Sequence, residues 1–146
     1  MTDFELVPVK DEETLATCLS IRRNVFIEEK KVPEEIEVDH DDVLGGDCDH
    51  FLMLSRGLPA GTFRCRGKGN RVKIQRFCVL RQFRRAGIGG QALRSFDRIA
   101  LEKGAKEIEV EAKYEVSRFY LSCGFEPVSE VFEEVGVPHV KMIKKL

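Results

Sequence analysis

The chain has 146 residues, a length that suits one domain with an independent hydrophobic core. Its formal net charge is -1, it has no apolar run of about 18 residues as a membrane-spanning helix needs, and its start lacks a signal-peptide pattern. We therefore expect residues 1–146 to form a single cytoplasmic domain without a membrane span.

The first half of the chain combines one helix with several strand-like segments. Asp11-Glu12-Glu13 places acids in the first turn of the helix, where they complement its dipole, and Val32-Pro33 ends it. Two apolar runs joined by Arg56-Gly57-Leu58-Pro59 have the rhythm of a hairpin. In chain order we expect a strand at 4–9, a helix from 11 to about 30, a helical turn near 34–37, and strands at 50–55, 60–66 and 72–80.

The second half predicts two helices and three more extended segments. Apolar residues recur every three to four positions from Ile88 to Lys103, before Gly104 stops that helix. Residues 107–112 alternate with period two, as a strand with one wetted face does. A helix at 115–123, an extended segment at 125–128 and a last strand at 139–144 follow. This order predicts an α/β fold with one mixed sheet of about six to seven strands and helices on both faces.

The most informative segment joins the strand at 72–80 to the next helix. Its sequence is Gln82-Phe83-Arg84-Arg85-Ala86-Gly87-Ile88-Gly89-Gly90. The first turn of a helix has unpaired N–H groups and partial positive charge, so a bound anion satisfies both. Gly87 and Gly89 let the backbone approach such a ligand, while Arg84 and Arg85 add charge-assisted donors. The segment therefore predicts a pyrophosphate site.

Three anion-binding motifs fit a strand, a glycine turn and a helix in this order. A Walker loop needs a Gly-Lys-Ser/Thr terminus, which this segment lacks. A dinucleotide fingerprint is met by Gly87, Gly89 and Ala92, but it opens a doubly wound domain for which the chain up to Leu146 is too short. A small nucleotide-dependent oxidoreductase is therefore disfavoured. The third motif, Arg/Gln-x-x-Gly-x-Gly/Ala, is matched by residues 84–89.

This loop resembles that of the GNAT superfamily of N-acetyltransferases, where it cradles the pyrophosphate of acetyl-CoA. The family's Phe-Tyr-x-x-x-Gly-Phe motif is similar to residues 119–125. Three further runs look like the YjcF/ElaA-type branch: Arg22-x-x-Val25-Phe26-x-x-Glu29, Val32-Pro33-x-Glu35-x-Glu37-x-Asp39 and Phe132-x-Glu134-x-Gly136-Val137-Pro138-His139-x-x-Met142. The resemblance implies a GNAT-type sheet and direct transfer of an acetyl group from acetyl-CoA to a primary amine of a small molecule or peptide, in a ternary complex.

The resemblance also implies roles outside the loop. A backbone N–H on the preceding strand, around Cys78 or Val79, would hold the oxyanion, and Phe77, Cys78 and Val79 are candidate cofactor contacts. The Tyr120 hydroxyl would donate a proton to the departing thiolate, since the ordinary pKa of a tyrosine is about 10 and that of a thiol is about 8.5. Lys113 is a candidate cofactor contact, although Glu111-Ala112-Lys113 replaces the residues that many members carry there. Candidates for the base that acts on the amine, directly or through a water, are Glu35, Glu37 and His139, with Glu29 behind them.

Charge is partitioned along the chain. Ten acidic residues lie between Glu28 and Asp49, and thirteen basic residues lie between Arg64 and Lys106. We expect the basic segment to suit a polyanionic cofactor and the acidic segment to attract a cationic amine. The basic segment lacks interleaved aromatic residues, which disfavours a nucleic-acid partner.

The remaining expectations concern metals, partners and an alternative function. Five cysteines without a Cys-x-x-Cys spacing disfavour a zinc site and a disulfide framework, so no metal is expected. The resemblance makes a homodimer plausible. A non-catalytic acyl-CoA sensor or protein-interaction module on the same fold stays open as the alternative to an enzyme.

Overall fold

The computed structural model describes residues 3–67 and 69–146, which are arranged around one eight-stranded mixed sheet. Its strands follow the order β1-β2-β3-β4-β5-β8-β6, and β7 pairs with β8 beside this path. β4 and β5 are parallel, whereas the other neighbours are antiparallel. The strands are β1 (Phe4–Pro8), β2 (Cys48–Ser55), β3 (Leu58–Arg66), β4 (Arg71–Val79), β5 (Glu107–Lys113), β6 (Glu126–Pro127), β7 (Phe132–Glu134) and β8 (Val137–Lys145).

The predicted mixed α/β fold is confirmed, with a strand count slightly above the expected six to seven. The unexpected strand is β7, which has only three residues. Its turn into β8 contains Val135 and Gly136, both with positive φ (51° and 73°). A two-residue turn of that kind favours glycine or asparagine, so a valine in it gives no hairpin signal in the sequence.

The helical elements surround the sheet, and the N-terminal helix differs from its prediction. The expected helix from 11 to about 30 is α-helical only to Arg22 and continues as a π-helix, in which Lys30 N–H donates to the Val25 carbonyl at 3.0 Å. No described helix has the length and apolarity needed to cross a bilayer. The helices are α1 (Glu12–Arg22), π-helical η1 (Arg23–Glu29), α2 (Glu34–Glu37), 3₁₀-helical η2 (Arg81–Phe83), α3 (Ile88–Glu102), 3₁₀-helical η3 (Tyr114–Val116) and α4 (Ser117–Ser122).

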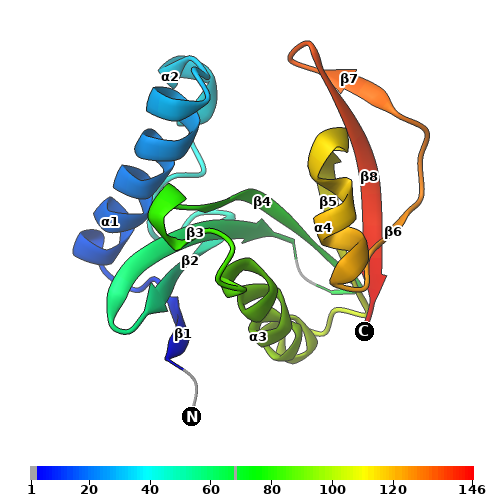
Figure 1. Cartoon of the computed structure of the whole chain (residues 1–146). Coiled ribbons are helices and arrows are strands. Elements are labelled where there is room, and N and C mark those ends of the chain that lie inside the picture. Colours follow the sequence, from blue (N-terminus) through cyan, green and yellow to red (C-terminus); the bar gives the residue numbers. More distant parts are fainter. Residues whose placement is uncertain (1–2, 68) are drawn as a thin grey trace.

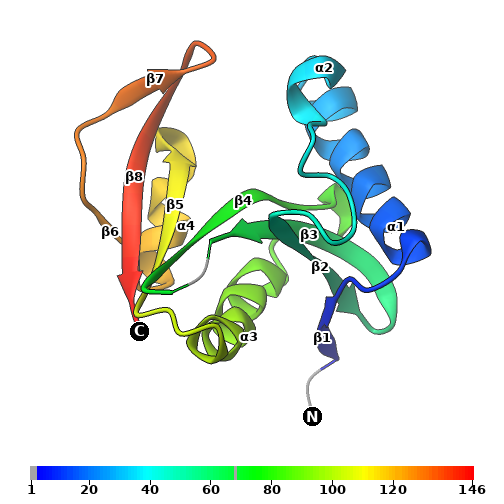
Figure 2. The ribbon, with the colours of Figure 1, turned by 180° about the vertical axis from the view of Figure 1, so that it is seen from behind.

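Helices cover both faces of the sheet, as predicted. Successive strand residues point to opposite faces, and the two buried clusters follow this alternation. Leu52 and Cys78 pack with α1, whereas Phe51 and Met53 pack in the cluster that holds α3 and α4. Figures 1 and 2 show α1 and α3 on different sides of β2–β4.

The parallel strands β4 and β5 separate halfway along their length. They pair from Arg71 opposite Glu107 to Ile74 opposite Val110, and β4 then continues to Val79 and β5 to Lys113 without further pairing between them. A register shift between β3 and β4 accompanies the divergence, and Arg76 within it has a φ of 56°. The C-terminal ends of the two strands therefore diverge, as the ribbon shows (Figure 1).

Candidate functional site

The loop before α3 leaves the N-terminus of that helix uncapped. Arg85 and Gly87 have left-handed backbone conformations, with φ of 66° and 78°. No side chain caps the helix, and the Gln91 N–H makes the first backbone bond of the helix, to the Gly87 carbonyl at 3.0 Å. The N–H groups of residues 88–90 therefore have no partner within the helix. The loop has the donors and the dipole that the sequence predicts for an anion site.

The first turn of α3 touches both β4 and α4. A Cβ atom on Gly89 would lie 3.0 Å from Cζ of Phe119 and 3.5 Å from Cε1 of Phe77. The Phe77 ring centroid lies 6.0 Å from that of Phe119 and 6.2 Å from that of Tyr120. The structure therefore brings together the loop, the end of β4 and the Phe-Tyr motif.

Arg84, predicted to offer donors to a phosphate, is engaged elsewhere. Its Nη1 and Nη2 each donate to the Glu29 carboxylate at 2.8 Å, and its Nε donates to the Val79 carbonyl at 2.8 Å. The two bonds from Arg84, with a smaller contribution from Arg81, lower the pKa of Glu29 from 4.5 to about 2. Arg85 is exposed and forms no ion pair with any residue that the structure describes. Of the two loop arginines, Arg85 is the one whose charge is not matched by a carboxylate.

The end of β4 exposes one backbone donor to the strand opening. The Leu80 N–H donates to the Ala60 carbonyl at 2.8 Å, so Leu80 and Ala60 form a hydrogen-bonded pair between the β4 end and β3. Because the direction of backbone groups alternates along an antiparallel ladder, the Val79 N–H points away from β3. That side is where β5 has separated from β4. The side chain of Cys78 is buried against α1, and burial raises the pKa of this thiol to about 12.

Tyr120 lies on α4 inside an aromatic group. Its side chain is 6% exposed, and its ring meets those of Phe119 and Phe125 edge to face at 5.0 and 5.5 Å. Among the described residues its hydroxyl has no hydrogen-bond partner. Burial is the main cause that raises the pKa of Tyr120, with Cys123 and Cys78 contributing. The phenol is therefore protonated at neutral pH and can act as a donor.

The three candidates for a base occupy very different environments. Glu37 is buried and bonded by Arg22 Nε and Nη2 at 3.1 Å, with Arg76 Nε at 3.2 Å. Glu35 is exposed on the same helical turn, α2, and pairs with no described basic residue. His139 lies on β8, where its Nδ1 is 2.7 Å from the Val137 carbonyl. Glu37 is part of a buried ion-pair network, so Glu35 is the glutamate of the two whose carboxylate is available to a ligand.

Lys113, at the end of β5, is paired in register with His139, near the start of β8. Lys113 forms no ion pair with a described residue. It lies directly before η3, in a different segment from the glycine loop. The His139 Nε2 lies 3.8 Å from a Glu134 carboxylate oxygen, and its ring stacks on Phe132. No described contact joins either residue to the loop, so they form a separate part of the candidate site.

Most carboxylates of the acidic segment 28–49, which we expected to attract a cationic amine, form ion pairs within the protein. Eight of its ten acids form ion pairs with described arginines and lysines, which leaves only Glu28 and Glu35 without one. Seven of the eight have a partner in the basic segment, so the two charged segments neutralise each other. The paired acids are Glu29, Glu34, Glu37, Asp39, Asp41, Asp42, Asp47 and Asp49. An acidic segment and a basic segment in one chain can also indicate that the two pair with each other, and the sequence contained that signal.

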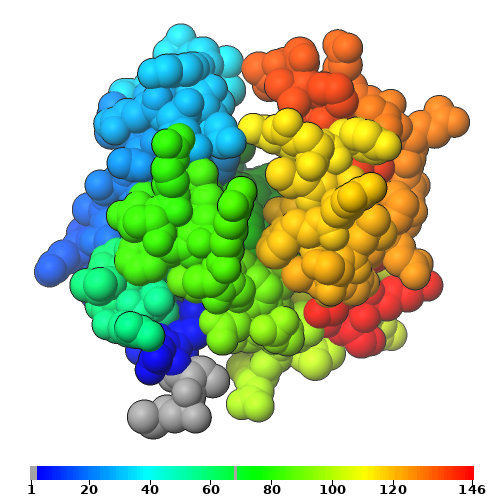
Figure 3. Space-filling model, viewed as in Figure 1, coloured from blue at the N-terminus to red at the C-terminus, as the bar shows by residue number. Residues whose placement is uncertain are grey.

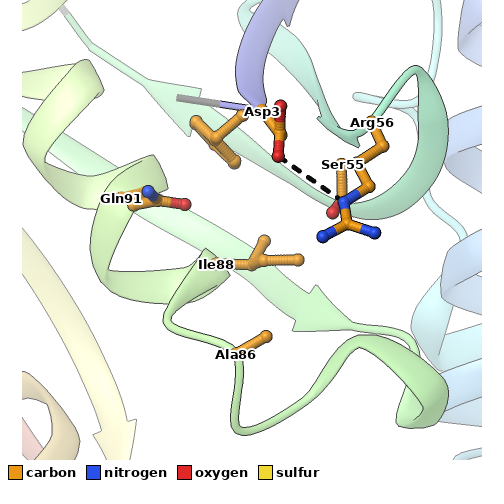
Figure 4. Close-up of a pocket in the computed structure, with 7 residues that line it drawn as sticks. Asp3, Ser55, Arg56, Ala86, Ile88 and Gln91 are labelled. Atoms are coloured by element: carbon orange, nitrogen blue, oxygen red, sulfur yellow. Dashed lines mark ion pairs between the residues drawn. The ribbon is translucent and has the colours of Figure 1, made fainter. Parts of the chain in front are cut away.

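The surface is hollowed beside this site. In Figure 3 a hollow separates the blue-to-green first half of the chain from the yellow and orange atoms that follow β5. A cavity of about 380 Å³ also adjoins the loop near the β2–β3 turn, where Arg56 pairs with Asp3 at 3.5 Å (Figure 4). Its lining residues are Asp3, Phe4, Ser55, Arg56, Ala86, Ile88 and Gln91. The loop is therefore bordered by open space.

Comparisons relate the chain to known proteins. A family model described as "Acetyltransferase (GNAT) domain" matches residues 23–146. The uncharacterised N-acetyltransferase YjcF of Bacillus subtilis is 33% identical over 142 residues, which cover 97% of this chain and 99% of YjcF. The crystal structure of Escherichia coli ElaA matches with a TM-score of 0.83 and 27% identity over 99% of this chain and 100% of ElaA. An Elizabethkingia anophelis GNAT acetyltransferase with acetyl-CoA bound has a TM-score of 0.71 and 16% identity over 100% of both chains, a likeness of fold.

Proposed function

The chain belongs to the GNAT family of acetyltransferases, and from this we propose that it moves the acetyl group of acetyl-CoA directly to a primary amine of a small molecule or peptide. The family assignment agrees with the resemblance predicted from the sequence. The observation that carries the proposal is the uncapped N-terminus of α3, whose first three N–H groups have no partner within the helix and whose Gly89 lies beside Phe77 of β4 and Phe119 of α4. Acetyl-CoA bound to an Elizabethkingia acetyltransferase of the same fold supports the choice of cofactor.

In the proposed complex the loop at 84–90 binds the pyrophosphate through its backbone. The glycines allow close approach, and the exposed guanidinium of Arg85 adds charge. The pantetheine arm then lies between the diverging ends of β4 and β5, where it completes their unpaired edges. This arrangement brings the thioester toward Val79 and Tyr120.

Two donors then serve the reacting thioester. The Val79 N–H stabilises the oxyanion that forms when the amine attacks the carbonyl carbon, because a fixed backbone donor in a water-poor site is effective there. The Tyr120 hydroxyl donates to sulfur as the carbon–sulfur bond breaks and negative charge develops on the thiolate. The raised pKa of Tyr120 keeps the phenol protonated until that moment.

The amine must lose protons before and during its attack. We propose that Glu35 accepts them through a water, since Glu37 is tied to two arginines. His139 is the alternative acceptor on the opposite side of the opening, and Lys113 next to it can contact the cofactor arm. The test replaces Glu35 and His139 by Gln in turn and measures the rate against pH. The substitution that abolishes the fall in rate at low pH identifies the base.

Calorimetric titration with acetyl-CoA tests the proposal, followed by a screen of primary amines for release of free CoA. We expect saturable binding by the wild type and strongly weakened binding by Gly87→Val, because a β-branched residue adopts the left-handed conformation of Gly87 only with strain. Gly45→Val is a matched control, since Gly45 has a similar φ of 72°, an added Cβ meets nothing within 4 Å at either position, and Gly45 lies between α2 and β2, outside the loop. Equal binding by Gly87→Val and Gly45→Val would contradict the proposed loop. Binding without turnover on any amine would favour a sensor.

A further inference from the structure

Arg84 and Glu29 form the most specific side-chain contact of the glycine loop. Two parallel N–H···O bonds of 2.8 Å join them, and a third bond of 2.8 Å ties Arg84 back to the Val79 carbonyl. The Glu29 side chain is 17% exposed and that of Arg84 is 33% exposed, so water screens the pair only partly. Bidentate arginine–carboxylate pairs fix geometry as well as charge.

The pair connects two segments that are 55 residues apart. Glu29 is the last residue of the π-helix η1, and segments of this rare helix type are frequent at functional sites. Arg84 follows the η2 turn and precedes the two left-handed residues of the loop. Arg81 in that turn also approaches Glu29, at 3.5 Å. Glu29 thus holds both ends of the turn that connects β4 to the loop.

We propose that Glu29 is a positioning residue for acetyl-CoA binding, acting through Arg84 to hold the backbone donors of residues 87–90 in the geometry that binds pyrophosphate. This inference rests on the proposed function and adds to it a residue that does not touch the cofactor. A loop fixed before binding loses less conformational freedom when the ligand arrives, so affinity rises without a new contact. Arg84 then acts as part of the scaffold, and its charge is neutralised by Glu29.

Two roles for Arg84 predict opposite effects of Glu29→Gln. If Arg84 is a direct phosphate ligand, removing the competing carboxylate frees its guanidinium and acetyl-CoA binds more tightly. If Glu29 positions the loop, the same substitution weakens binding. Loss of one negative charge near a polyanion also favours binding in general, so the control must remove the same charge nearby. Glu28→Gln does so, because Glu28 is adjacent and pairs with no described basic residue.

The experiment measures the dissociation constants of acetyl-CoA and dephospho-CoA by calorimetry for the wild type, Glu29→Gln and Glu28→Gln. We expect Glu29→Gln to weaken both by about tenfold, the loss of one charge-assisted interaction. The losses should be equal, since dephospho-CoA keeps the pyrophosphate. Glu28→Gln should stay within about twofold of the wild type. Tighter binding by Glu29→Gln, or binding equal to that of Glu28→Gln, would overturn the inference.

A second pair of variants keeps the test decisive if Glu29→Gln unfolds. Glu29→Asp retains the charge at shorter reach, and Arg84→Gln retains a donor for Val79. We expect both to bind acetyl-CoA more weakly than the wild type, and the double substitution to lose no more than the larger single loss, because each removes the same contact. Additive losses would overturn the inference. Absence of acetyl-CoA binding by the wild type would instead overturn the proposed function itself.

Discussion

A Cβ atom on Gly89 would lie 3.0 Å from Cζ of Phe119, so the first turn of α3 packs so closely against α4 that a side chain there would press on the ring. We expect Gly89→Val to push the Phe119 ring and to cost about 1–3 kcal/mol of unfolding free energy, the usual range for overpacking. Acetyl-CoA affinity should fall with it, because the displaced turn carries the proposed phosphate donors.

Gly90→Ala is the matched control for this contact. The added Cβ would meet only the far end of the Arg94 side chain, at 3.4 Å, and that end can move aside. Urea denaturation should therefore find Gly90→Ala close to the wild type in stability. A Gly89→Val protein that matches Gly90→Ala in stability would show that the Phe119 contact is not restrictive.

Tyr120→Phe should separate binding from turnover. The ring packing with Phe119 and Phe125 is kept, while the hydroxyl that we propose as donor to the leaving thiolate is lost. We expect acetyl-CoA affinity within about twofold of the wild type and a turnover about 100-fold lower, the lower range for general-acid catalysis. Tyr114, the other tyrosine, is 56% exposed, and Tyr114→Phe should leave turnover unchanged. Unaltered turnover in Tyr120→Phe would remove Tyr120 from the mechanism.

Arg22 should contribute far more to stability than its neighbour Arg23. The Arg22 side chain is 1% exposed and bonds Glu37 and Asp42, so Arg22→Met leaves buried carboxylates short of a partner. We expect a loss of about 3 kcal/mol, as for other broken buried pairs. Arg23 pairs with Glu34 on the surface, and Arg23→Met should cost less than about 1 kcal/mol. Equal losses in chemical denaturation would contradict the buried network.

Acid should reduce the contribution of Glu29 to stability. Its pKa is lowered to about 2 from an ordinary 4.5, so the ionised form favours the folded state above pH 4.5 and this advantage is lost as pH falls toward 2. The cationic side chains that face Glu29 are those of Arg84, Arg81 and Lys30.

The test of this acid dependence compares the wild type with Glu29→Gln at several pH values. The difference in unfolding free energy should be constant above about pH 5.5 and should shrink steadily between about pH 4.5 and pH 2. Carboxylates common to both proteins cancel in the difference. A gap that does not change with pH would mean that Arg84 does not stabilise ionised Glu29.

The helices next to the glycine loop could be predicted because they depend on residues close together in the sequence. The periodicity of residues 88–103 and the glycines before them were sufficient to predict α3 and the position of its N-terminus. The helix predicted at 115–123 is likewise present as the end of η3 and α4, and it ends before Gly124 with its φ of 94°. These features depend on backbone preferences and on helix geometry, which a linear sequence records directly.

Contacts between distant segments could not be read from the sequence. The loop motif indicates an arginine at position 84 but not that Glu29, 55 residues earlier, neutralises it. The acidic segment looked like a surface for a cationic amine, yet burial of Glu37 and Asp42 beside arginines requires knowing that α2 folds over β4. Charge patterning gives the sign of a segment, while its partner depends on tertiary structure.

Titration of the protein with acetyl-CoA, with NAD as the comparison ligand, tests the central claim most directly. The account predicts saturable binding of one acetyl-CoA per chain, weakened by Gly87→Val, and no detectable binding of NAD. It is contradicted if acetyl-CoA does not bind, or if it binds equally well after the N-terminus of α3 has been altered.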